Sequence, residues 1–96
     1  MQRQQVLATL NDHKEALKGF GVKSLLLFGS FARDEAQSNS DIDLLVEFDR
    51  PVGLFTFVRV QRYLEEILGR SIDLGTPDSL KSYLQEPVMR EAICAF

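Results

Sequence analysis

The sequence has few of the residues that form disulfides or bind zinc in small proteins. Its 96 residues include one cysteine, one histidine and no tryptophan. The single Cys94 cannot close an internal disulfide, and one cysteine with one histidine excludes a zinc site built from such ligands. A lone thiol in a chain of this kind is typical of a reducing cytosol. Any metal ion would have to be held by oxygen ligands.

Long apolar runs and a surplus of positive charge are also missing. The first 20 residues contain no apolar core of signal-peptide type, and no stretch approaches the roughly 20 apolar residues that span a bilayer. We therefore expect a cytoplasmic protein without membrane contact. The net charge of −3 argues against broad nucleic-acid binding, which depends on many Lys and Arg side chains facing phosphates.

What remains is an ordinary globular composition, with 45% apolar and 26% charged residues, and we expect residues 1–96 to form one domain. Apolar spacing and turn residues predict helices over 2–18, 30–36 (N-cap Ser30) and 54–69, strands over 22–28, 41–48 and 71–75, a helix opened by Thr76-Pro77, and a last helix from Pro87 to about Ala95. This order is typical of an α/β or α+β domain: a small mixed sheet of three strands with helices packed on it.

The predicted helix over 54–69 should turn Leu54, Phe57, Val58, Leu64 and Leu68 toward the core. Its exposed arginines, with Arg70 after it, are more typical of a solvated face than of a binding site.

Gly29-Ser30, between an apolar run and a short helix, is the first candidate for a functional role. The N–H groups of a first helical turn lack internal partners, and the helix dipole is positive there, so the turn attracts anions such as phosphate. Gly29 would admit a phosphate close to the backbone, and the Ser30 hydroxyl adds a donor. The ordinary alternative is a strand-to-helix turn with an N-cap serine.

Asp41 and Asp43 are the second candidate. Residues i and i+2 of a strand point to the same face, with Cα atoms roughly 6.5–7 Å apart. Two carboxylates so placed repel each other unless a cation or proton lies between them. Oxygen ligands suit Mg²⁺, which binds a few carboxylates together with substrate phosphates. The alternative is a strand that begins with two solvated aspartates.

Asp73, in "SIDLG", completes the set. If the strands over 41–48 and 71–75 are neighbours, Asp73 can share a face with Asp41 and Asp43. A third carboxylate beside two metal ions could bind one of them and accept a proton from an attacking hydroxyl. The alternative is an edge-strand aspartate that faces water.

The stretch "GSFARDEAQSNSDIDLLVEF" (29–48) resembles the Gly-Ser, Asp-x-Asp signature of the DNA polymerase β-like nucleotidyltransferase superfamily. Within it, the chain is similar to the minimal nucleotidyltransferase (MNT) proteins from about residue 22 onward, including "SIDLGTPDSLKSYLQEPVMREAI". The resemblance implies the polymerase β-like fold.

The resemblance also implies a role for each candidate residue. Gly29 and Ser30 would bind the triphosphate, with Arg33 as a basic residue near the nucleotide. The metal ligands would be Asp41, Asp43 and Asp73, and Asp73 would also be the general base. One departure is Asp34, at a position where many relatives have glycine.

The implied reaction uses ATP and two Mg²⁺ ions: a hydroxyl attacks the α-phosphorus, pyrophosphate leaves and AMP stays on the acceptor. Relatives that resemble this chain are antitoxins paired with a helical HEPN ribonuclease toxin, so the resemblance implies a toxin tyrosine as acceptor and a homo- or hetero-oligomer. Three alternatives stay open: a module that neutralises its partner by contact alone, a glycosyltransferase-type Asp-x-Asp, which needs a longer chain, and a domain without a site.

Overall fold

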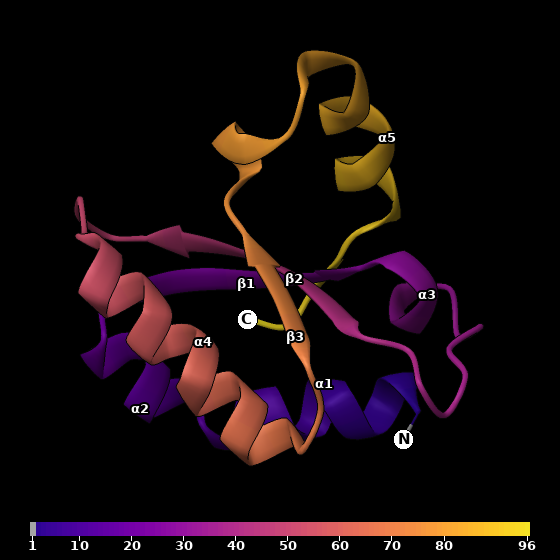
Figure 1. Cartoon of the computed structure of the whole chain (residues 1–96), viewed down its shortest axis with the longest axis horizontal. Coiled ribbons are helices and arrows are strands. Elements are labelled where there is room, and N and C mark those ends of the chain that lie inside the picture. Colours follow the sequence, from indigo (N-terminus) through magenta and orange to yellow (C-terminus); the bar gives the residue numbers. More distant parts are fainter. Residues whose placement is uncertain (1) are drawn as a thin grey trace.

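The computed structural model describes residues 2–96, and its sheet has the strand order β3-β2-β1-β4 (Figure 1). Strand β2 pairs antiparallel with β1 and parallel with β3, and β4 pairs antiparallel with β1. The predicted class, a mixed sheet with helices packed on it, is confirmed. The elements are α1 (Arg3–Asp12), α2 (Lys14–Gly19), β1 (Val22–Phe28), α3 (Gly29–Ala32), β2 (Ile42–Phe48), α4 (Leu54–Leu68), β3 (Ile72–Gly75), the 3-10 helix η1 (Pro77–Ser79), α5 (Ser82–Glu91) and β4 (Ile93–Cys94).

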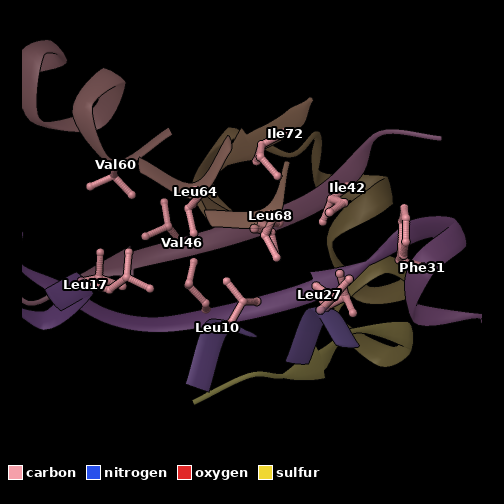
Figure 2. Packing of buried hydrophobic residues seen from close by; sticks show 14 of the residues in the cluster. Leu10, Leu17, Leu27, Phe31, Ile42, Val46, Val60, Leu64, Leu68 and Ile72 are labelled. Atoms are coloured by element: carbon pink, nitrogen blue, oxygen red, sulfur yellow. The ribbon is translucent and has the colours of Figure 1, made fainter. Parts of the chain in front are cut away.

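The core lies between one face of the sheet and the helices α1, α2 and α4 (Figure 1). Ile42, Leu44 and Val46 alternate along β2 and are fully buried, as the period-2 pattern predicts. Figure 2 shows how the labelled side chains of the helices and strands gather in this layer. The helices contribute Val6, Leu10, Leu17, Val60, Leu64 and Leu68 to it.

The other face of the sheet is covered only in part. The helix α5 and the turn η1 lie on this side (Figure 1), and α5 contributes no buried residue. Since side chains alternate along a strand, Asp43 and Leu45, which lie between the core residues Ile42, Leu44 and Val46, face this other side, where Leu45 is buried and Asp43 half-buried. The aspartates are therefore on the face away from the core.

The C-terminal region differs most from the sequence prediction. Thr76-Pro77 opens only the short 3-10 helix η1, which ends at Leu80 with extended backbone. The last helix, expected from Pro87 to about Ala95, spans Ser82–Glu91 with Pro87 inside it, and the chain then forms β4, where Ile93 pairs with Leu27. The sheet thus has four strands and not three, because pairing with the free edge of β1 overrides helix propensity there.

Three smaller expectations were also wrong. The first helix is divided near His13 into α1 and α2, and α3 spans only Gly29–Ala32, with Phe28 and not Ser30 at its N-cap. Leu54 and Val58, both expected in the core, do not belong to it: Leu54 is 75% exposed at the first turn of α4, Val58 lines a surface hollow with it, and Val60 is the core residue instead. Within residues 2–96, no helix combines the length and apolar character needed to cross a bilayer.

The two ends of α4 supply a matched test of the core. Leu64 is fully buried, so Leu64→Ala should lower the free energy of unfolding by about 2–5 kcal/mol. Leu54→Ala, the same change on the same helix at an exposed position, should change it by less than about 0.5 kcal/mol. Urea denaturation of the two variants measures both values. Equal losses would place Leu54 in the core.

Candidate active site

Strand pairing places Asp43 at the centre of the candidate site. In the β1–β2 ladder Asp43 lies opposite Phe28, the last residue of β1, and in the β2–β3 ladder it lies beside Asp73. The condition for Asp73 to join the site, that its strand is a neighbour of the strand carrying Asp43, is met. The Gly-Ser turn, which follows Phe28 directly, and the two aspartates therefore meet at one place on the open face.

Gly29 is in direct contact with the Asp43 carboxylate. A Cβ atom built on Gly29 would overlap Asp43 Oδ2 and lie 3.0 Å from its Cγ atom. The backbone of Gly29 also has φ +73°, in the left-handed region that only glycine adopts without strain. Both facts require glycine here, and the first ties the turn physically to the Asp-x-Asp segment.

Asp43 is half-buried, and its surroundings disfavour its negative charge. The pKa of the Asp43 carboxyl is raised to about 6, first by burial, then by the charge of Asp73 and a hydrogen bond with it, and last by the charge of Asp41. Arg33 acts in the opposite direction. This is the electrostatic signature of carboxylates gathered where a cation or a proton must compensate them.

The carboxylates suit a magnesium ion in kind, since all the donors are oxygens. They do not form a closed cage: among residues 2–96, no three His, Cys, Asp or Glu side chains are already arranged to hold a metal ion. Asp41 and Asp73 are both exposed. An ion bound here would take its remaining ligands from water or from a substrate's phosphates, as Mg²⁺ usually does.

The short helix α3 carries the other predicted site residues. Ser30 lies in its first turn, where backbone N–H groups lack intrahelical partners. Arg33, at its C-cap, forms ion pairs with Glu35 and with Glu91 of α5, at 3.3 and 3.2 Å. These two carboxylates raise the pKa of Arg33, Glu35 most strongly. Arg33 therefore stays charged beside the turn.

Asp34, the departure from the family pattern, has a backbone conformation that few residues adopt. It has φ +59°, which makes it the one non-glycine residue with positive φ among residues 2–96. Glycine adopts this conformation freely, and aspartate is one of the few other residues that tolerate it. The backbone conformation at this position therefore accepts an aspartate, as it would accept a glycine.

Arg70 has a role that the sequence pattern does not reveal. The pattern predicts a solvated face, but the Arg70 guanidinium donates hydrogen bonds to the carbonyl oxygens of Ser38 and Ser40, at 3.0 and 3.1 Å. It also lies over the ring of Phe31, 5.4 Å from its centroid. Arg70 thus ties the loop that leads into Asp41 to α3. The sequence carries no local signal of this, because the partners are 30 or more residues away.

A comparison with known families decides the identity of this fold. The family model described as "Nucleotidyltransferase domain" matches residues 10–94. The chain belongs to the nucleotidyltransferase domain family. The family that the Gly-Ser and Asp-x-Asp motifs predicted is therefore confirmed. The protein is a nucleotidyltransferase.

Individual relatives agree with this assignment. The nucleotidyltransferase is 38% identical over 91 residues to the protein adenylyltransferase MntA of Thermococcus cleftensis, covering 94% of this chain and 92% of that protein. A solved structure of a minimal nucleotidyltransferase has a TM-score of 0.84 and 34% identity, covering 97% of this chain and 95% of the other. The predicted fold is confirmed.

A more distant solved structure shares the fold at a TM-score of 0.67. It is the complex of a tri-AMPylated Shewanella oneidensis HEPN toxin with an MNT antitoxin. The identity is 19%, and the match covers 98% of this chain and 71% of the other.

The contact between Gly29 and Asp43 can be tested with two glycines that share a backbone conformation. Gly69 has φ +66° and nothing within 4 Å of the place that a Cβ atom would take, so Gly69→Ala should lose only the left-handed penalty of about 1–2 kcal/mol. Gly29→Ala adds the overlap with Asp43 and should lose at least about 1 kcal/mol more. Urea denaturation of both variants measures the difference; equal losses would contradict the close approach.

The raised pKa of Asp43 predicts a pH dependence in metal-free buffer with a chelator. The pKa is about 6 in the folded protein against 3.8 ordinarily, so the stabilisation from protonated Asp43 is complete below about pH 4 and is lost as the pH rises through 6. The thermal midpoint of the wild type should fall by a few °C over this range, since about 1 kcal/mol shifts it by roughly 4–8 °C.

Asp43→Asn removes the titrating group and should flatten this dependence, so the variant becomes more stable than the wild type near pH 7.5. The control is Asp78→Asn, at an exposed aspartate outside the site, which should keep the wild-type slope. Calorimetric scans between pH 4 and 8 measure all three proteins. An unchanged slope in Asp43→Asn would rule out this carboxyl as its source.

Proposed function

We propose that the nucleotidyltransferase transfers AMP from ATP, with Mg²⁺, to a tyrosine hydroxyl of a HEPN ribonuclease toxin in the cytoplasm and so acts as its antitoxin. The observation that carries the proposal is the meeting of the Gly-Ser turn, Asp43 and Asp73 on the open face of the sheet. The adenylyltransferase relative and the AMPylated toxin in complex with an antitoxin of the same fold support the choice of AMP and of the acceptor.

The triphosphate would lie against the first turn of α3. Gly29 has no side chain to obstruct it, and the backbone N–H groups and the Ser30 hydroxyl would donate to its oxygens. Arg33 would exchange its exposed carboxylate partners, Glu35 and Glu91, for a phosphate, since exposed ion pairs contribute little stability.

Asp41 and Asp43, with Asp73, would hold the magnesium ions. A metal ion there would supply positive charge for the developing transition state and the leaving pyrophosphate. Because Asp73 is exposed, the acceptor hydroxyl can approach it from solvent, and Asp73 would accept the hydroxyl proton as the general base.

The proposal predicts distinct defects for the carboxylates. Asp41→Asn/Asp43→Asn should weaken MgATP binding by tenfold or more in a calorimetric titration. Asp73→Asn should lower AMP transfer by about 10²-fold or more, the typical contribution of a general base. The acceptor is the cognate HEPN toxin, defined as the one from the same genome whose growth arrest this chain relieves. Transfer is measured with labelled ATP.

The control is Asp12→Asn, at an exposed aspartate at the end of α1, which should bind MgATP and transfer AMP like the wild type. The alternative, neutralisation by contact alone, predicts that Asp41→Asn/Asp43→Asn still relieves the growth arrest. That result, or a wild type that binds no MgATP, would reject the enzymatic proposal.

A further inference from the structure

The start of α4 carries an apolar surface that the nucleotide site does not use. Leu54 and Phe55 are 75% and 90% exposed, the two most exposed large hydrophobic side chains among residues 2–96. Together with Val58, Arg59 and Arg62 they line a hollow of about 460 Å³. We call these five residues the α4 ridge. Contiguous exposed apolar groups of this kind mark interaction surfaces in soluble proteins.

The two arginines of the α4 ridge are without ionic partners. Within residues 2–96, neither Arg59 nor Arg62 has a carboxylate within 4.0 Å, whereas Arg33, Arg50 and Arg90 each form an ion pair. In a chain of net charge −3, two free guanidinium groups beside exposed apolar side chains favour an acidic partner. Arginine and large aromatic residues are also the types that dominate binding energy at protein interfaces.

The α4 ridge is continuous with a groove that extends to the end of β3. Leu54 lines both the hollow of the ridge and a second one of about 630 Å³, whose other walls include Phe48, Phe57, Thr76 and Asp78. Thr76 follows β3 directly and stands three residues from Asp73, about 10 Å along a strand. A protein seated on the ridge could therefore extend a segment along the groove to the candidate general base.

A second copy of this chain fits the α4 ridge poorly. The helix α4 spans Leu54–Leu68, so Arg59 and Arg62 lie on either side of its middle. A two-fold pairing of α4 with its own copy, centred on the helix, would bring the arginines of the two copies together, and like charges at an interface are unfavourable.

We propose that the α4 ridge is the docking surface for the acceptor protein, which binds it through acidic side chains beside apolar ones. This inference rests on the proposed function, because it takes the HEPN toxin as the acceptor. It adds where the acceptor binds, at a surface separate from the Gly-Ser turn and the aspartates that would hold the nucleotide.

The test uses variants that change the α4 ridge and spare the nucleotide site. Arg59→Glu/Arg62→Glu should raise the KM for the cognate toxin by tenfold or more, and Phe55→Ser should raise it by about tenfold. Both variants should keep the wild-type Kd for MgATP and the wild-type thermal midpoint, because the altered side chains are exposed. Direct binding of the toxin, measured by calorimetry without ATP, should weaken in parallel.

Two controls match these changes elsewhere on the surface. Lys23→Glu/Lys81→Glu alters the net charge equally at two exposed lysines, and Tyr83→Ser removes an exposed aromatic ring from α5, on the other side of the sheet from α4 (Figure 1). Both should bind the toxin like the wild type.

The outcomes separate the two proposals. A wild type that binds the toxin but transfers no AMP rejects the proposed reaction, and the binding data still decide the docking surface. Ridge variants that bind the toxin within twofold of the wild type overturn the docking surface alone. A wild type that binds no HEPN toxin overturns both. Sedimentation that shows a dimer dissolved by Phe55→Ser would assign the ridge to a second copy and also overturn the inference.

Discussion

The close approach between Gly29 and the Asp43 carboxylate is the constraint on which the rest of the site depends. The β1–β2 register puts Phe28 opposite Asp43, so the next residue of the chain must turn across the Asp43 side chain. Only a residue without a Cβ, able to adopt φ +73°, can do so. One contact therefore joins the start of α3, which faces the candidate phosphate position, to the carboxylates.

The same strand serves the core and the site because its side chains alternate. Ile42, Leu44 and Val46 bury one face of β2 against the helices. This burial fixes the strand register, because a slip of one residue would turn these side chains to the opposite face of the sheet. The register in turn sets Asp43 beside Asp73 on the opposite face. The hydrophobic effect thus provides the energy that holds mutually repelling carboxylates together.

Long-range ties complete the arrangement around this centre. Arg70 joins the loop before Asp41 to α3, and the ion pair between Arg33 and Glu91 joins α3 to α5. The open face of the sheet is covered only in part: Leu45 is buried there, whereas Asp43 is half-buried and Asp73 is exposed. Apart from these carboxylates, two hollows on the surface adjoin β2, the turn after β3 and the start of α4.

The sequence alone determined the strands over 22–28, 41–48 and 71–75 to within a residue, the long helix α4 and the family, since these rest on local periodicity and on motifs of fixed spacing. It also named Gly29, Asp43 and Asp73 as parts of one site.

The tertiary structure decided what depends on distant partners. Ile93 and Cys94 form a strand because they pair with the edge of β1, Leu54 is exposed at the first turn of α4, and the half-buried Arg70 donates hydrogen bonds to carbonyl oxygens 30 or more residues away. Burial, strand pairing and a raised carboxyl pKa are properties of neighbours in space, and a sequence lists only neighbours along the chain.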